Sequence, residues 1–178
     1  MKRIAKILAV SFLSITTFAA FAQSEADKSR LRSEIEKDLT ENILPFWMEM
    51  PDYPKGGVLN ARILWTFSHA YGQYGLEEYR KVADSMQREF IDRFIDPEYG
   101  GVYWQINPDG TKQTYCLAFG IYGLSEHFRV TGDKESLDAA IRLFRTLEDI
   151  VHDKTYGGYI ETFSREWKDT DSKGVDGK

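Results

Sequence analysis

The chain of 178 residues contains one cysteine, Cys116, and only three histidines. A single cysteine cannot form an internal disulfide. No cysteine follows the apolar run near the N-terminus, which excludes a lipid-modified cysteine there. Cys116 lies within an apolar stretch, and this context predicts a small, buried hydrophobic residue.

Basic residues are fewer than acidic residues, 23 against 28, and long apolar runs are scarce. The formal net charge is −5, which favours neither a nucleic-acid partner nor an anionic membrane surface. Residues 7–22 form an apolar run that follows the basic residues Lys2, Arg3 and Lys6. This run is short for a membrane span, and Ala20-Phe21-Ala22 fits a signal-peptidase site. We therefore expect residues 1–22 to be a cleaved signal peptide and the protein to be exported, either periplasmic or secreted. A retained membrane anchor is the alternative.

The remaining sequence contains a repeat with a period of 57 residues. Most of the matched positions are glycines or loop residues, which chance rarely aligns together. A fixed period of this length predicts helical hairpins that bury their apolar faces against their neighbours. The matched positions are Lys55 and Lys112, Ser68 and Ser125, Gly75 and Gly132, Ala83 and Ala140, Asp96 and Asp153, and Tyr99-Gly100-Gly101 and Tyr156-Gly157-Gly158.

Apolar residues at helical spacing predict five helices. Pro45 should end or kink the first and push Leu44 out of helical geometry. Gly75 and Gly132 are the expected C-caps of the second and fourth. These two helices are more apolar than the third and fifth, a contrast typical of inner and outer layers. The five helices are expected over 31–43, 58–74, 76–94, 113–131 and 134–151.

The connections contain short extended segments. Residues 102–106 read as a strand, and the turn sequence Asn107-Pro108-Asp109-Gly110 after it predicts a small β-hairpin. A second extended piece is expected within 153–163. Residues 168–178 are rich in Asp, Ser, Lys and Gly, which predicts a frayed tail. Residues 23–167 then form the folded domain.

Arg62 stands out within the apolar second helix. A guanidinium near a packed face is costly unless it pairs or lines a wet cavity. The residues alone leave two interpretations open, a structural arginine and a functional group facing a lumen. Aromatic residues make up 14% of the chain, a content that suits a carbohydrate site and equally suits a packed helical core.

Several ordered motifs resemble the N-acylglucosamine 2-epimerase family, and within it the branch that acts on cellobiose or mannobiose. The resemblance covers nearly all of the chain after the apolar run. The motifs are Asn42-Ile43-Leu44-Pro45-Phe46-Trp47, Lys55-Gly56-Gly57-Val58-Leu59-Asn60-Ala61-Arg62-Ile63-Leu64-Trp65-Thr66-Phe67, Gly100-Gly101-Val102-Tyr103-Trp104, Lys112-Gln113-Thr114-Tyr115 and Ala118-Phe119-Gly120-Ile121-Tyr122-Gly123-Leu124-Ser125-Glu126.

This resemblance implies an all-α (α/α)6 barrel, here an incomplete arc of about five helices. It also implies inversion of C2 in a reducing-end sugar, a disaccharide or hexose, by proton removal and return through a cis-enediol. Arg62 and Tyr115 match the arginine and tyrosine that hold the substrate oxygens, and are the expected catalytic residues. Trp65 and Trp104 join them as expected substrate-binding residues. The resemblance implies no metal and no organic cofactor.

Two departures from the family pattern are evident. The loop from Asp52 to Lys55 is about thirteen residues shorter than its repeat counterpart between Asp96 and Lys112. In addition, six hairpins need about 340 residues, so the family's two catalytic histidines are expected beyond Lys178. The three histidines present, His69, His127 and His152, are interpreted as structural or solvated.

The leading interpretation is therefore an exported sugar 2-epimerase, of which this chain forms the N-terminal part and is inactive by itself. Three alternatives remain. An aldose–ketose isomerase would use similar groups on the same scaffold. An (α/α)6 glycoside hydrolase would need two carboxylates across a sugar bond, for which Glu126 and Glu161 are the candidates. The third is a non-catalytic remnant.

Overall fold

A computed structural model describes residues 24–50, 52, 55–106 and 110–168. The chain divides into two units, Met1–Glu49 and Met50–Lys178, which are described separately below. The expected signal peptide (1–22), the hairpin turn at 107–109 and residues 169–178 of the expected tail lie outside the described residues. Within the described residues, no helix has the length and apolar character to cross a membrane.

The first unit contains one continuous helical stretch. Residues 24–38 are helical and lead into the π-helix η1 (Leu39–Ile43) and then into α2 (Leu44–Met48). The expectation that Pro45 forces Leu44 out of helical geometry is wrong, because Leu44 has φ −63° and ψ −47°. Pro45 lies in the first turn of α2, where its missing N–H is tolerated, and the wider π-turn before it shifts the backbone register.

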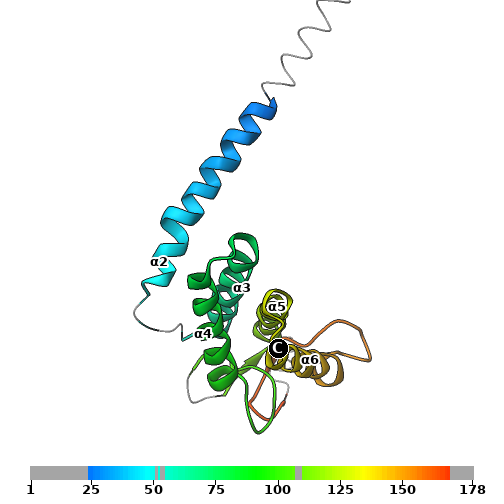
Figure 1. Ribbon diagram of the computed structural model, residues 1–178. Coiled ribbons are helices and arrows are strands. Elements are labelled where there is room, and N and C mark those ends of the chain that lie inside the picture. Colours follow the sequence, from blue (N-terminus) through cyan, green and yellow to red (C-terminus); the bar gives the residue numbers. More distant parts are fainter. Residues whose placement is uncertain (1–23, 51, 53–54, 107–109, 169–178) are drawn as a thin grey trace, which may run out of the picture. The chain divides into compact units, whose positions relative to one another are not determined.

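The second unit is built from two helical hairpins that repeat with the expected period. The first pairs α3 (Gly57–Tyr74) with α4 (Glu77–Phe94). The second pairs α5 (Thr114–Thr131) with α6 (Lys134–Thr146), which continues as the π-helix η2 (Leu147–Val151). α5 begins and ends 57 residues after α3, which confirms the repeat. α3 packs against both α4 and α5, and α5 packs against α6 (Figure 1).

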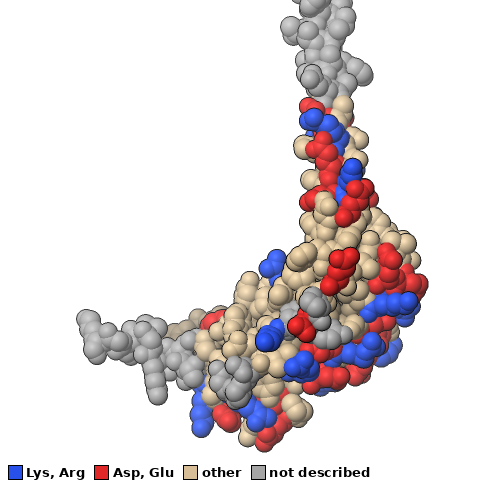
Figure 2. Space-filling model, turned by 90° about the vertical axis from the view of Figure 1, so that its left-hand side faces the viewer, with Lys and Arg blue, Asp and Glu red and all other residues tan. Residues whose placement is uncertain are grey.

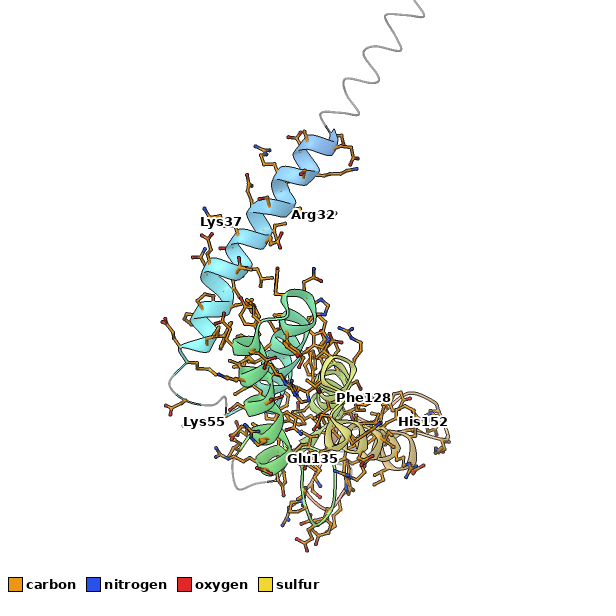
Figure 3. All side chains as sticks on the ribbon, in the orientation of Figure 1. Arg32, Lys37, Lys55, Phe128, Glu135 and His152 are labelled. Carbon is orange, nitrogen blue, oxygen red and sulfur yellow. The ribbon has the colours of Figure 1, made fainter. Side chains whose placement is uncertain are left out.

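The loops repeat as faithfully as the helices. Gly75 and Gly132 both adopt the left-handed conformation, and each N–H binds the carbonyl four residues earlier at 2.8 Å. The second of these acceptors belongs to Phe128, labelled in Figure 3. In the following loops, Oδ1 of Asp96 and Oδ1 of Asp153 each accept two backbone N–H groups from residues two and three positions on. The predicted C-caps are thus confirmed, and the repeat extends to the loops that follow the second helix of each hairpin.

The core lies where the inner helices α3 and α5 meet each other and the outer helices. α4 buries one face through Tyr79, Met86, Phe90 and Phe94. Gly123 allows close approach of the inner helices, because a Cβ there would lie 2.7 Å from the Ala61 carbonyl oxygen. Cys116 is fully buried, as expected, and burial raises its pKa to about 12. Over the face drawn in Figure 2, acidic and basic side chains of this unit are intermixed.

The prediction of a continuous strand at residues 102–106 is wrong. These residues pair singly with three different segments, through the bridges Ile95–Val102, Tyr103–Lys112 and Gly56–Gln105. Successive residues therefore never share one neighbour, and no ladder forms. The antiparallel ladder in the described residues joins β1 (Lys112–Gln113) to β2 (Thr162–Phe163). The Tyr103–Lys112 bridge does bring together the two sides of the expected hairpin.

Candidate active site

Arg62 and Tyr115 line the same pocket, one from each inner helix. Arg62 lies in the second turn of α3 and Tyr115 in the first turn of α5. The pocket has a volume of about 400 Å³, and Trp65, Thr66, Phe119 and Tyr122 complete its described lining. The structure thus brings together three of the four expected site residues. Their chemical roles remain predictions.

Backbone hydrogen bonds from the loops fix the starts of both inner helices. The Gly57 N–H donates to the Trp104 carbonyl at 3.0 Å, and the Thr114 N–H donates to the Glu161 carbonyl at 2.9 Å. A side chain at Gly57 would force its surroundings to shift, because a Cβ would lie 2.6 Å from the Cys116 sulfur. Since two helix N-termini lie close to the pocket, their dipoles favour negative charge that develops there.

The pocket wall is an array of aromatic rings. Trp65 stacks on Tyr122 with centroids 5.0 Å apart and an interplanar angle of 12°. Tyr115 packs edge-on against Phe119 at 4.9 Å. Tyr115 and Tyr122 are 52% and 43% exposed, whereas Trp65 is half-buried. The two tyrosine side chains are therefore more exposed in the pocket than Trp65, whose indole packs on the Tyr122 ring.

Trp104, the fourth expected site residue, does not line this pocket. Its side chain is half-buried in the loop before β1, and its backbone accepts the Gly57 N–H described above. In the described structure Trp104 contributes to the site by capping α3. The motif that contains it could be identified from sequence, but the direction of its side chain could not.

The three histidines occupy different environments. His127 is buried, with Nδ1 2.8 Å from Ser136 Oγ and Nε2 3.0 Å from Asp84 Oδ1, so its role is structural. His152 follows η2 and lies 3.4 Å from the Glu148 carboxylate (Figure 3). His69 has a half-exposed side chain and pairs with Glu126. None of the three is among the described lining residues of the pocket.

The two acids considered for a hydrolase do not face each other across the pocket. Glu126 is held by Arg129 and His69, and Glu161 is an exposed loop residue. No carboxylate belongs to the described lining. The described residues also contain no group of three or more His, Cys, Asp or Glu side chains placed to hold a metal ion.

Sequence reasoning missed a buried ionic cluster beside the start of α5. The Lys112 ammonium lies 3.1 Å from Asp96 Oδ2, and the Arg165 guanidinium binds the same carboxylate at 3.0 and 3.2 Å. Burial alone would raise the pKa of Asp96, but hydrogen bonds from Arg165, two backbone N–H groups and Lys112 hold it well below its usual value. Burial lowers the pKa of Lys112, and its pairing with Asp96 opposes this shift.

The same cluster contains aromatic side chains. The Lys112 ammonium lies 4.5 Å from the Trp167 ring centroid, and the Trp167 indole N–H donates to the Tyr99 carbonyl at 2.8 Å. The cluster thus joins the first Gly-Gly loop, β1 and the segment after β2. Its central residue, Lys112, lies three residues before Tyr115 in the sequence. The sequence marked Lys112 as a repeat position and as a motif residue, but it could not show the partners of Lys112, because they lie far away along the chain.

Comparison with known proteins places these features in a family. The model of the family described as N-acylglucosamine 2-epimerase (GlcNAc 2-epimerase) matches residues 49–176. A cellobiose 2-epimerase of Bacteroides fragilis is 44% identical over 164 residues, which are 78% of this chain and 42% of that protein. The chain therefore spans less than half the length of this relative.

Solved structures give the same result. The cellobiose 2-epimerase of Spirochaeta thermophila matches with a TM-score of 0.75 and 31% identity, over 79% of this chain and 41% of the other. The cellobiose 2-epimerase of Bacillus thermoamylovorans matches with a TM-score of 0.76 and 29% identity, over 83% and 45%. The four helices of the second unit thus correspond to part of an (α/α)6 barrel, as expected from the sequence.

Proposed function

Because the chain belongs to the N-acylglucosamine 2-epimerase family, we propose that it supplies the electrophilic side of a sugar 2-epimerase site. The observation that carries this proposal is the shared pocket of Arg62 and Tyr115. A guanidinium and a phenol at the N-termini of adjacent inner helices suit a substrate on which negative charge develops.

The proposed reaction inverts C2 of an open-chain aldose. Removal of the C2 proton sends its electron pair toward the C1 carbonyl oxygen and gives a cis-enediolate. The Arg62 N–H groups donate hydrogen bonds to the oxygen on which charge accumulates, and the Tyr115 hydroxyl binds a neighbouring oxygen. Return of a proton to the opposite face of C2 completes the inversion. Tyr115 and Tyr122 offer ring faces for the apolar face of the sugar.

The names of the relatives support a proposal for the substrate class. Several are named cellobiose 2-epimerase, so we propose a reducing-end disaccharide such as cellobiose. A hexose is the alternative substrate. No imidazole or carboxylate that could remove and return the proton is among the described lining residues, so we expect these groups to lie in the part of the family fold that this chain does not cover.

A chimera tests this proposal. Residues 24–168 would replace the corresponding segment of the Bacteroides fragilis relative, and the product would be incubated with cellobiose. We expect the glucose unit at the reducing end to become mannose. Released glucose would indicate a hydrolase, and a ketose end would indicate an isomerase. A folded chimera that leaves cellobiose unchanged would contradict an epimerase role for this segment.

We also propose that the protein is exported and cleaved after Ala22. The basic residues, apolar run and Ala-Phe-Ala site of the sequence support this location. Mass spectrometry of the protein from its natural compartment would show a mature N-terminus at Gln23. A species that keeps Met1 in the cytoplasm would contradict the proposal.

A further inference from the structure

One helical turn beyond the pocket, His69 and Glu126 form a close pair between the inner helices. His69 Nδ1 lies 2.8 Å from Glu126 Oε1. The two residues are 57 positions apart, so each occupies the same place in its own repeat. Trp65 and Tyr122, which line the pocket, are also 57 positions apart. They stack on each other about one helical turn before His69 and Glu126. The pair therefore supports a wall of the pocket without belonging to its lining.

Glu126 is the fixed end of this pair. Its side chain is 10% exposed, and Arg129 binds both carboxylate oxygens, with Nε 2.7 Å from Oε2 and Nη2 2.6 Å from Oε1. The hydrogen bond from Arg129 is the main cause that lowers the pKa of Glu126, and the bond from His69 adds to it. The carboxylate is thus ionised at neutral pH and only accepts hydrogen bonds. His69 Nδ1 must then carry the hydrogen of this contact.

His69 passes this constraint to Trp65. The imidazole and indole rings are nearly parallel, with centroids 4.7 Å apart and an interplanar angle of 8°. Because Nδ1 is bound to a fixed carboxylate, the imidazole cannot rotate about its χ2 bond without losing that hydrogen bond. The Trp65 indole therefore packs against two rings, the imidazole of His69, whose orientation is fixed, and the phenol ring of Tyr122.

We propose that Glu126 and His69 act as positioning residues that set the orientation of Trp65 and, through it, of Tyr122. Neither residue contacts the pocket, yet both determine the shape of its aromatic wall. The consequence for sugar affinity rests on the function proposed above. The positioning itself does not, because it concerns only side chains of this chain.

NMR of the 178-residue chain tests the positioning directly. In the native protein the ring current of Trp65 should shift the His69 carbon-bound protons upfield. Glu126→Gln keeps an acceptor oxygen but removes the charge and the two-point bond with Arg129. We expect the His69 protons to move toward their free-histidine positions and the Trp65 indole N–H signal to broaden. His69→Phe retains a ring without the anchoring donor and should affect the same indole signal.

The matched control is Glu148→Gln, because Glu148 lies 3.4 Å from His152 in a similar pair outside the pocket. It should leave the Trp65 signals unchanged. Unaltered His69 and Trp65 signals in Glu126→Gln, or an unaltered indole signal in His69→Phe, would overturn the proposal.

Titration with cellobiose separates the two proposals. If cellobiose shifts the Trp65 indole signal, Glu126→Gln should raise the Kd for cellobiose about tenfold. This factor is the equivalent of one net hydrogen bond. A change in ring geometry without any sugar-induced shift in the native chain would support the positioning role and count against sugar binding by this chain alone. Sugar binding of equal strength in native protein and Glu126→Gln would contradict the effect on affinity.

Discussion

At the scale of single residues, Arg62 is the side chain on which the proposed chemistry depends most. It is exposed in the pocket, and the described hydrogen bonds and ion pairs leave its guanidinium available to a ligand. In the chimera, Arg62→Ala should lower kcat/KM by roughly 100-fold or more, equivalent to about 3 kcal/mol of transition-state stabilisation. Steady-state kinetics with cellobiose measures this effect.

A suitable control for this variant is Arg88→Ala, because Arg88 is an exposed arginine of α4 outside the pocket. It should retain native kinetics. Epimerisation by the Arg62→Ala chimera at the native rate would remove Arg62 from the mechanism and restore the interpretation of a structural arginine.

Asp96 makes the stability of the second unit sensitive to acid. Its folded-state pKa lies below its ordinary value, so ionised Asp96 stabilises the fold at pH values above about 4, the pKa of an unfolded aspartate. This stabilisation is lost as the pH falls below that value. Asp96→Asn should cost about 3–5 kcal/mol at pH 7, as expected when one member of a buried ion pair is removed.

Urea unfolding at pH 7 and at pH 3 tests this expectation, since the difference between native protein and Asp96→Asn should shrink in acid. Asp153→Asn is the matched control. Asp153 accepts two backbone hydrogen bonds in the same way as Asp96, but it takes part in none of the described salt bridges. An equal loss for both variants at pH 7 would show that the ion pairs contribute little.

At the scale of elements, the two Gly-Gly loops have the same backbone but different surroundings. Gly101 and Gly158 have φ of 75° and 78°. A Cβ on Gly101 would lie 2.4 Å from the Trp167 ring, whereas a Cβ on Gly158 would meet nothing within 4 Å. Gly158→Ala should therefore cost about 1–2 kcal/mol for the left-handed conformation alone. Gly101→Ala should cost more, because it also displaces Trp167 from Lys112.

Chemical denaturation of both variants, together with tryptophan fluorescence, measures this difference. Gly101→Ala should change the emission of Trp167, and Gly158→Ala should leave the emission unchanged. Equal stability losses without a spectral change would contradict the close packing of Trp167 on this loop.

The sequence predicted regular elements well because their signals are local or periodic. The 57-residue spacing and the glycine caps located α3 and α5 to within a residue. Leu44 was misassigned because the rule for residues before proline does not anticipate a π-turn that shifts the register. The segment 102–106 has the composition of a strand, but strand formation depends on a neighbour, and its neighbours change at each residue.

The candidate site was predictable in part for a similar reason. Arg62 and Tyr115 could be placed together because the repeat sets their helices side by side. The pairing of Lys112 with Asp96 and Arg165 could not be predicted, since loops alone bring these residues together. His69 was interpreted as structural or solvated, and its contact with Glu126 depends on the distance between two helices, which no residue pattern specifies.

At the scale of the whole molecule, we predict that the 178-residue chain alone does not epimerise cellobiose. Deprotonation at C2 requires a base within hydrogen-bond reach, and the described lining of the pocket contains neither a carboxylate nor an imidazole. Incubation with cellobiose in D₂O, followed by NMR of the C2 position, measures proton exchange with high sensitivity. Deuterium at C2 would contradict the prediction and would direct attention to His69, the histidine nearest to the pocket wall.

The register between α3 and α5 has a consequence for association. Trp65 meets Tyr122 and His69 meets Glu126, so each contact joins a position to its own counterpart one period later. A second copy that continued this repeat would place its α3 beside α5 of the first copy, so the two copies would contribute different surfaces and the interface would be heterologous. Two copies that met through such surfaces would stack head to tail with no two-fold axis. Growth would continue until the rotation closed a ring, and otherwise it would produce an open filament.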